Sequence, residues 1–297
     1  MKRAVCLLVL TITSALAQQP AKDQDLIRFK NGRELSGNIT RVIDGSVEVK
    51  SKSEGGGVAT QQFPIADIER VDFAEAGEVI QKLPSYKPSN APQLLSVWEA
   101  RRGLLPLPQS VTGAIGLRVA HLLLETGKPQ DAQQAENILK EIIAEDWDEV
   151  RRDQANALII ESLRLSGKRE EAIKAAEKFL EGEATAHGKA EASYSLAMAL
   201  AENYRDFIEE NPRWEIDPIM RPQRQRLYNQ ILDLYLSPYL LYEAPPDLTP
   251  KSLLAMANFL LEYNEVTAAV AVAEDIVQVF PNSPEVPKAK ALIEENS

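Results

Sequence analysis

More than two thirds of the chain, from Ala91 to the C-terminus, has helical patterning with no strand-forming run in it. Apolar residues recur there at three- and four-residue spacing, and short turns separate the segments. Such segments bury their apolar stripes by packing against their sequence neighbours as antiparallel hairpins. After a helix at 92–103 and a proline-bounded connector at 104–108, we expect helices that end near 127 and at 131–145, 150–166, 169–181, 186–209, 222–242, 250–263, 265–280 and 285–295.

Two segments of this region repeat one pattern. Residues 160–179 place Gly167 in the turn between two helices, and residues 257–281 place Asn264 there. In both segments, twelve residues separate an early apolar or small position from an alanine in the second helix, Ala172 or Ala269. Alanine at this place allows close approach of two antiparallel helices. The pattern therefore predicts stacked helical hairpins.

The turn sequence from Gly167 to Ala172, with Glu171 before the alanine, resembles the tetratricopeptide repeat, and Pro281 stands where such a hairpin commonly ends. The sequence departs from the family at Ile160, where a small residue is usual, and the two segments lie 97 residues apart, which is no multiple of 34. An irregular helical bundle is the alternative. The resemblance implies an array that holds peptides or helices of other proteins in a concave groove and rarely catalyses reactions.

Residues 25–73 have strand patterning instead. Short alternating runs at 26–29, 34–42, 46–50, 58–63 and 69–73 are separated by turn signals, and residues 64–68 form one helical turn. Asn31-Gly32 and Asp44-Gly45 are typical of tight hairpins, and Gly37 favours a bend or bulge. Five such strands predict a small closed barrel. The spacing resembles that of the SH3-like and Sm-like small barrels at the front of bacterial exported proteins.

Sm-like proteins often bind RNA, but the charge of this segment argues against nucleic acid. Residues 25–72 carry seven Lys or Arg and eight Asp or Glu, whereas phosphate binding needs a basic face. A barrel of this size buries little core. We therefore expect it to lean on the helices or on a second copy of itself, and self-association through its edge strands is one possible outcome.

The N-terminus has the pattern of a secretory signal. Lys2 and Arg3 precede a short apolar core, and Ala15-Leu16-Ala17 forms a small-x-small cleavage site. We expect a signal peptide at 1–17, a short leader at 18–24, the barrel at 25–73, a linker at 74–90 and the helical-repeat domain at 91–297. The only cysteine, Cys6, lies inside the signal and is no lipidation site, and no later stretch is apolar enough to span a membrane. These features predict a periplasmic or secreted protein.

Two groups of residues are candidates for partner binding. The irregular stretch 211–218 holds Trp214 and leads through Arg221 into a helix with Arg224, and Trp and Arg are favoured at binding hot spots. Alternatively, Trp214 caps the apolar end of a hairpin. Four tyrosines follow at one helical face, which suits a groove for a peptide or glycan but is equally typical of a core; they are Tyr228, Tyr235, Tyr239 and Tyr242.

No pattern of catalytic, cofactor-binding or metal-binding residues is present. The two histidines, His121 and His187, are 66 residues apart and have no zinc-site spacing. No pair among the 44 acidic residues is distinguished as a general acid and base. The formal charge of −11 is concentrated in the helical part, where residues 74–297 carry 23 basic and 35 acidic side chains. That imbalance favours basic or neutral partners.

Together these features predict an α+β protein in which a small barrel precedes a tetratricopeptide-like array. We expect a non-enzymatic extracytoplasmic adaptor that binds envelope proteins or peptide segments through the groove of the array, without a cofactor. The alternative is a protein that binds or hydrolyses glycan or peptidoglycan with the Trp214 loop and the tyrosine face.

Overall fold

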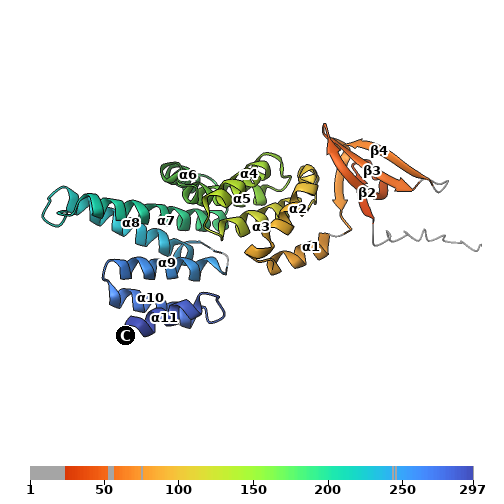
Figure 1. Ribbon diagram of the computed structural model, residues 1–297. Coiled ribbons are helices and arrows are strands. Elements are labelled where there is room, and N and C mark those ends of the chain that lie inside the picture. Colours follow the sequence, from red (N-terminus) through yellow and green to blue (C-terminus); the bar gives the residue numbers. More distant parts are fainter. Residues whose placement is uncertain (1–23, 53–56, 75, 243, 245, 297) are drawn as a thin grey trace, which may run out of the picture.

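The computed structural model describes residues 24–52, 57–74, 76–242, 244 and 246–296. The expected signal peptide and all of the expected leader except Gln24 lie outside the described residues. Within them, a five-stranded antiparallel sheet comes first and helices follow, which confirms the α+β layout (Figure 1).

The sheet has the strand order β4-β3-β2-β1-β5. Asp44 and Gly45, both at positive φ (47° and 71°), make the two-residue hairpin between β2 and β3 that the sequence predicts. A single 3-10 turn, Ile65–Asp67, separates β4 from β5. The strands begin and end within two residues of their predicted limits; they are β1 (Asp25–Phe29), β2 (Glu34–Ile43), β3 (Ser46–Lys52), β4 (Val58–Pro64) and β5 (Ile68–Asp72).

The sheet curls strongly. Phe29 of β1 and Phe63 of β4 bring their ring centroids to 5.0 Å, although neighbouring strands lie roughly 4.8 Å apart and two strands separate this pair. Gly37 permits the curl, since a Cβ at this position would lie 2.8 Å from the carbonyl oxygen of Lys50. Strands β4 and β5 are the two ends of the order, and no hydrogen-bonded ladder joins them in the described residues.

The core of the sheet is completed from the helical part of the chain. Leu104 and Leu107, from the connector between α2 and α3, pack into the cluster formed by the inward side chains of the strands, and Leu107 is fully buried. The amide of Val71 in β5 donates a hydrogen bond of 3.2 Å to the carbonyl oxygen of Pro108. The expectation that the small sheet leans on the helices is therefore confirmed.

The helices match the sequence expectation closely beyond residue 90. They are α2 (Ala91–Arg101), α3 (Thr112–Leu124), α4 (Pro129–Glu145), α5 (Glu149–Leu165), α6 (Arg169–Glu181), α7 (Ala186–Glu210), α8 (Met220–Leu240), α9 (Leu248–Glu262), α10 (Val266–Val279) and α11 (Val286–Asn296). The segment expected as a linker differs. It contains α1 (Ala76–Lys82), and its Leu83 is buried in the core around α2 and α3, so this segment is part of the helical packing.

Three hairpins share one turn geometry. Gly127, Gly167 and Asn264 end α3, α5 and α9 with φ between 66° and 79°, the left-handed conformation that stops a helix. In each case the residue five positions later is an alanine with no exposed surface in the second helix of the hairpin: Ala132, Ala172 and Ala269. The small side chain permits the close approach of the two helices that the repeat pattern predicts.

A buried ion pair fastens the connector to α5. Arg151 donates from Nε and Nη2 to the two carboxylate oxygens of Asp146 at 2.8 and 2.7 Å, and from Nη2 to the carbonyl oxygen of Ser110 at 3.1 Å. The Asp146 side chain is fully buried. A Cβ on Gly113 in α3 would overlap this carboxylate, so the ion pair depends on a glycine there.

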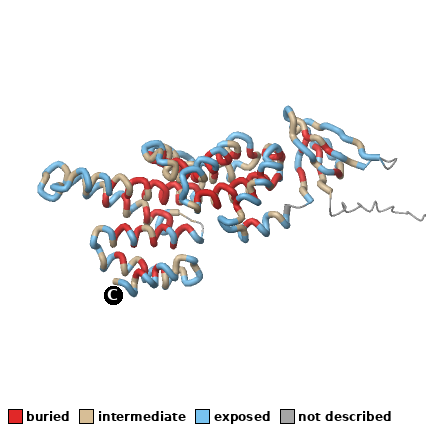
Figure 2. The backbone as a smooth tube through the Cα atoms, viewed as in Figure 1, coloured by how far each residue is buried: buried red, intermediate tan, exposed pale blue. Residues whose placement is uncertain are grey.

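Buried residues run through the centres of the hairpins from α2 to α11 (Figure 2). In Figure 1, α7 and α8 extend as a long hairpin beyond their neighbours, and α9 to α11 are stacked on one side of it. The start of α9 thereby returns toward α3 and α5. This return creates a cavity between α9 and those helices.

Candidate functional site

Trp214 and Arg224 meet in the structure, as part of an aromatic cluster at the long hairpin. The Arg224 guanidinium lies 4.6 Å from the Trp214 ring centroid, 4.9 Å from that of Tyr228 and 5.4 Å from that of Tyr204. One cation shared by three rings holds the 211–218 loop against α7 and α8. Trp214 is half-buried, and Arg224 stacks on its indole. Arg221 is exposed and is not part of the cluster.

The four tyrosines of α8 and the residues after it do not line one open groove. Tyr228 and Tyr235 are 8% and 2% exposed and pack against Phe259 of α9. The prediction that these two tyrosines contact a partner is therefore corrected. Their spacing places them on one face of the helix, and that face packs into the core. Tyr239 is 44% exposed, with its ring edge-on to Phe280, and Tyr242 is half-buried.

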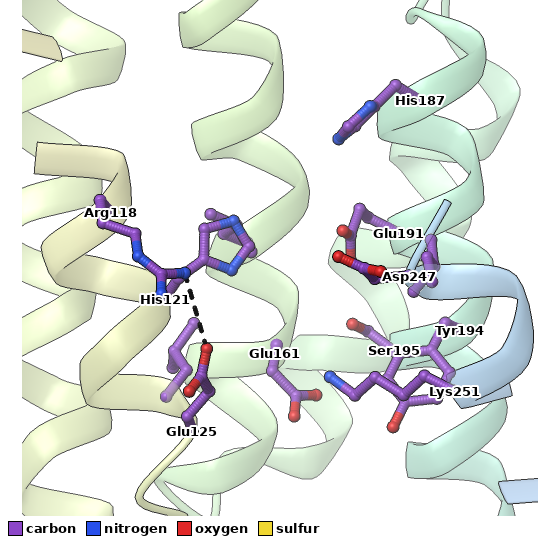
Figure 3. A pocket seen from close by; sticks show the side chains of 13 residues that line it. Arg118, His121, Glu125, Glu161, His187, Glu191, Tyr194, Ser195, Asp247 and Lys251 are labelled. Atoms are coloured by element: carbon purple, nitrogen blue, oxygen red, sulfur yellow. Dashed lines mark ion pairs between the residues drawn. The ribbon is translucent and has the colours of Figure 1, made fainter. Parts of the chain in front are cut away.

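A cavity of about 360 Å³ lies between α3, α5, α7 and the start of α9 (Figure 3). It is lined from four different hairpins and contains both histidines of the chain. Sequence reasoning missed this site, because its residues come from segments up to 133 positions apart. The lining residues are Arg118, His121, Leu124, Glu125, Leu158, Glu161, His187, Glu191, Tyr194, Ser195, Asp247, Leu248 and Lys251.

Helical periodicity brings the polar groups to the cavity. On α7, His187, Glu191 and Ser195 follow each other at intervals of four, so they share the face that looks inward. On α3, Arg118 and His121 share a face by the same rule. Polar residues at this spacing between buried alanines of α7 were the one sequence signal that pointed to the site.

The cavity shifts the titration of its acids and bases. Burial raises the pKa of the Glu191 carboxyl to about 7; the nearby Lys251 lowers this pKa and Glu161 raises it. Burial lowers the pKa of His121 to about 4, and the cations Lys251 and Arg118 lower it further. Burial also lowers the pKa of His187. Both imidazoles are therefore neutral at pH 7.

The two cations of the cavity are only partly engaged, because Nε of Arg118 is buried with no hydrogen-bond partner among the described residues. Arg118 donates to the carbonyl oxygen of Tyr86 at 2.5 Å and lies 3.8 Å from the carboxylate of Glu125. The ammonium of Lys251 stands 4.9 Å from the centroid of the Tyr194 ring. Glu161 is paired with Arg164 at 2.7 Å.

Glu191 and Asp247 differ from these residues. Neither carboxylate has a hydrogen bond or ion pair to any residue that the structure describes, although Asp247 precedes the first turn of α9. Figure 3 shows both side chains at the α7 and α9 side of the cavity. These two carboxylates share their side of the cavity with Lys251 of α9, whose charge lowers the pKa of Glu191.

Neither a serine–histidine pair nor a metal-ligand cluster is formed among the described residues of the cavity. Ser195 is 2% exposed and makes no hydrogen bond to either histidine of the cavity. In the part of the chain that the structure describes, no group of three or more His, Cys, Asp or Glu side chains is placed to hold a metal ion. No described helix is both long and apolar enough to cross a membrane.

No protein-family model matches this sequence, and neither a curated protein nor a solved structure matches it significantly.

Proposed function

We propose that this protein is a non-enzymatic extracytoplasmic adaptor, in which a small SH3-like barrel is attached to a tetratricopeptide-like array. The array binds a segment of an envelope protein at the cavity between α3, α5, α7 and α9. The observation that carries the proposal is the origin of the lining: each of four successive hairpins contributes its first helix. Arrays of stacked hairpins use this surface for extended ligands.

Two further observations support binding of a protein segment. The volume, about 360 Å³, lies within the roughly 300–1,000 Å³ range of ligand pockets and accommodates a side chain with its neighbouring backbone. The wall combines apolar surface from Leu124, Leu158 and Leu248 with charged groups. Glycan binding at the Trp214 loop is less favoured, because Arg224 covers a face of the indole that a sugar ring would need.

Site-specific cross-linking in the cells of origin tests this proposal. A photoreactive phenylalanine derivative replaces Glu125, an exposed residue at the cavity, and in a second variant replaces Glu145, an exposed residue at the end of α4. We expect one or two envelope proteins to be cross-linked at position 125 and not at 145. The same products from both positions, or none from either, would refute an adaptor that binds through this cavity.

A further inference from the structure

We propose that the cavity receives a basic side chain, lysine or arginine, of the partner segment, with the carboxylates of Glu191 and Asp247 as its acceptors. The inference rests on the proposed function and names the chemistry that the partner presents.

Acidic side chains outnumber cationic ones around the cavity. Two cationic and four acidic side chains line it, and both histidines are neutral at pH 7. Arg118 donates to a carbonyl oxygen and lies near Glu125, while its Nε has no partner among the described residues, and Lys251 stands over an aromatic ring. Glu191 and Asp247 make no hydrogen bond or close ion pair with a described residue, and Lys251 acts on Glu191 through its charge alone. A ligand carboxylate would meet four acidic groups, whereas an ammonium or guanidinium group would satisfy two unpaired acceptors.

The shape of the cavity also suits a long basic side chain. Leu124, Leu158 and Leu248 are 8%, 5% and 4% exposed and form apolar wall. Lysine and arginine have an aliphatic stem that packs on such surface while the charged end reaches polar groups. The acidic balance of residues 74–297 draws a basic segment toward this array from a distance.

Burial of Glu191 makes a charged ligand more favourable still. The carboxyl is kept partly protonated at pH 7 because the cavity is poorly solvated and Glu161 lies near it. A cation that enters next to Glu191 stabilises the ionised form and replaces the missing solvation. Glutamine at this position keeps the size of the side chain and removes the charge, so Glu191→Gln isolates the electrostatic part of recognition.

A peptide selection tests the assignment without knowledge of the partner. The full chain is immobilised as bait for random heptapeptides displayed on phage, in parallel with the double variant Glu191→Gln/Asp247→Asn and with Glu209→Gln. Glu209 is an exposed acid on the same helix, outside the cavity, and serves as the matched control. We expect Lys and Arg at one position of the recovered peptides to be enriched at least threefold by wild type and Glu209→Gln, and not by the double variant.

The best recovered peptide then allows a direct measurement of affinity. Replacement of its basic residue by norleucine keeps the stem and removes the charge, and we expect Kd to rise at least tenfold for wild type but less than threefold for the double variant. Circular dichroism confirms that each variant is folded. If the double variant unfolds, Asp247→Asn alone, at an exposed position, replaces it.

Three outcomes would overturn the inference: no peptide above background, peptides without a basic preference, or a preference that the double variant retains. Failure of the inference is distinguishable from failure of the proposed function. If cross-linking at position 125 captures a partner while the peptides show no basic preference, the adaptor stands and the ligand chemistry is wrong. If cross-linking also fails, the adaptor itself is refuted.

Discussion

The properties of a single residue in this protein depend on its surroundings in the folded chain. Glu191 and Glu209 lie on the same helix and have the same chemistry, but Glu191 faces a cavity and Glu209 faces solvent. Burial disfavours the charged form of Glu191 and raises the pKa of its carboxyl to about 7.

The pKa of Glu191 gives a testable dependence of stability on pH. The folded state binds this proton more tightly than the unfolded chain, whose glutamate pKa is near the ordinary 4.5. The contribution of Glu191 is therefore fully present below pH 4.5 and is lost as the pH rises through 7. Relative to Glu191→Gln, we expect the wild type to lose roughly 1–3 kcal/mol of unfolding free energy between pH 4.5 and 7.5.

Denaturant unfolding of the two proteins across this pH range measures the effect. His121 and His187 titrate in both, so their opposite contribution cancels in the difference between wild type and variant. If the unfolding free energies of the two proteins changed with pH in parallel, Glu191 would be ionised at pH 7 like an ordinary carboxyl.

Gly113 offers a second test at this scale. A methyl group there would overlap the buried carboxylate of Asp146 and lie 2.6 Å from Nε of Arg151, so the ion pair must move. We expect Gly113→Ala to destabilise the protein by about 1–3 kcal/mol, despite the better helix propensity of alanine. Gly103→Ala is the control, because nothing lies within 4 Å of a Cβ there. Equal denaturation midpoints for the two variants would contradict the steric argument.

Strands, helices and turns form where the sequence predicts them if residues close in sequence determine the local structure. The turns at Asp44-Gly45, Gly127 and Gly167 combine residues that accept positive φ with flanking periodic runs, so both hairpin type and helix ends were predictable. It was harder to predict which face an element presents to its neighbours. Tyr228 and Tyr235 follow a period that a groove and a core share, and only the packing of α9 on α8 decides for the core.

Tyr235 and Tyr239 of α8 form a matched pair that tests how α8 packs on α9. Tyr235 is 2% exposed and Tyr239 is 44% exposed, one turn further along the helix. We expect Tyr235→Ala to lower the unfolding free energy by about 3–5 kcal/mol, as for other large buried aromatic residues, and Tyr239→Ala by less than about 1 kcal/mol. Thermal unfolding followed by circular dichroism compares them. Similar losses would show that the α8–α9 packing differs from the one described.

In the molecule as a whole, the connector between α2 and α3 joins the two parts of the fold. Leu105 is fully buried in the helical core, and Leu107, two residues later, is fully buried in the core of the sheet. Patterning alone indicated a proline-bounded connector. The sequence could not predict which core each leucine joins, because the residues they pack against are distant in sequence. The cavity was hidden for the same reason, since four helices contribute to it.

The two leucines separate the stability of the two parts. We expect Leu107→Ala to remove roughly 2–5 kcal/mol of packing, chiefly from the sheet, and Leu105→Ala to remove a similar amount from the helices. Hydrogen exchange followed by mass spectrometry locates the effect. Leu107→Ala accelerates exchange in β1 and β5, and Leu105→Ala accelerates it in α2 and α3. Acceleration of the same peptides in both variants would refute the division.

The place of Leu107 also sets an order of events during synthesis. A ribosome makes the chain from its N-terminus, and all five strands are complete once residue 72 has been made. The sheet then still lacks Leu104, Leu107 and the carbonyl oxygen of Pro108. We therefore expect a nascent chain that ends before residue 104 to be sensitive to protease in its strands, and one that extends past residue 108 to become resistant.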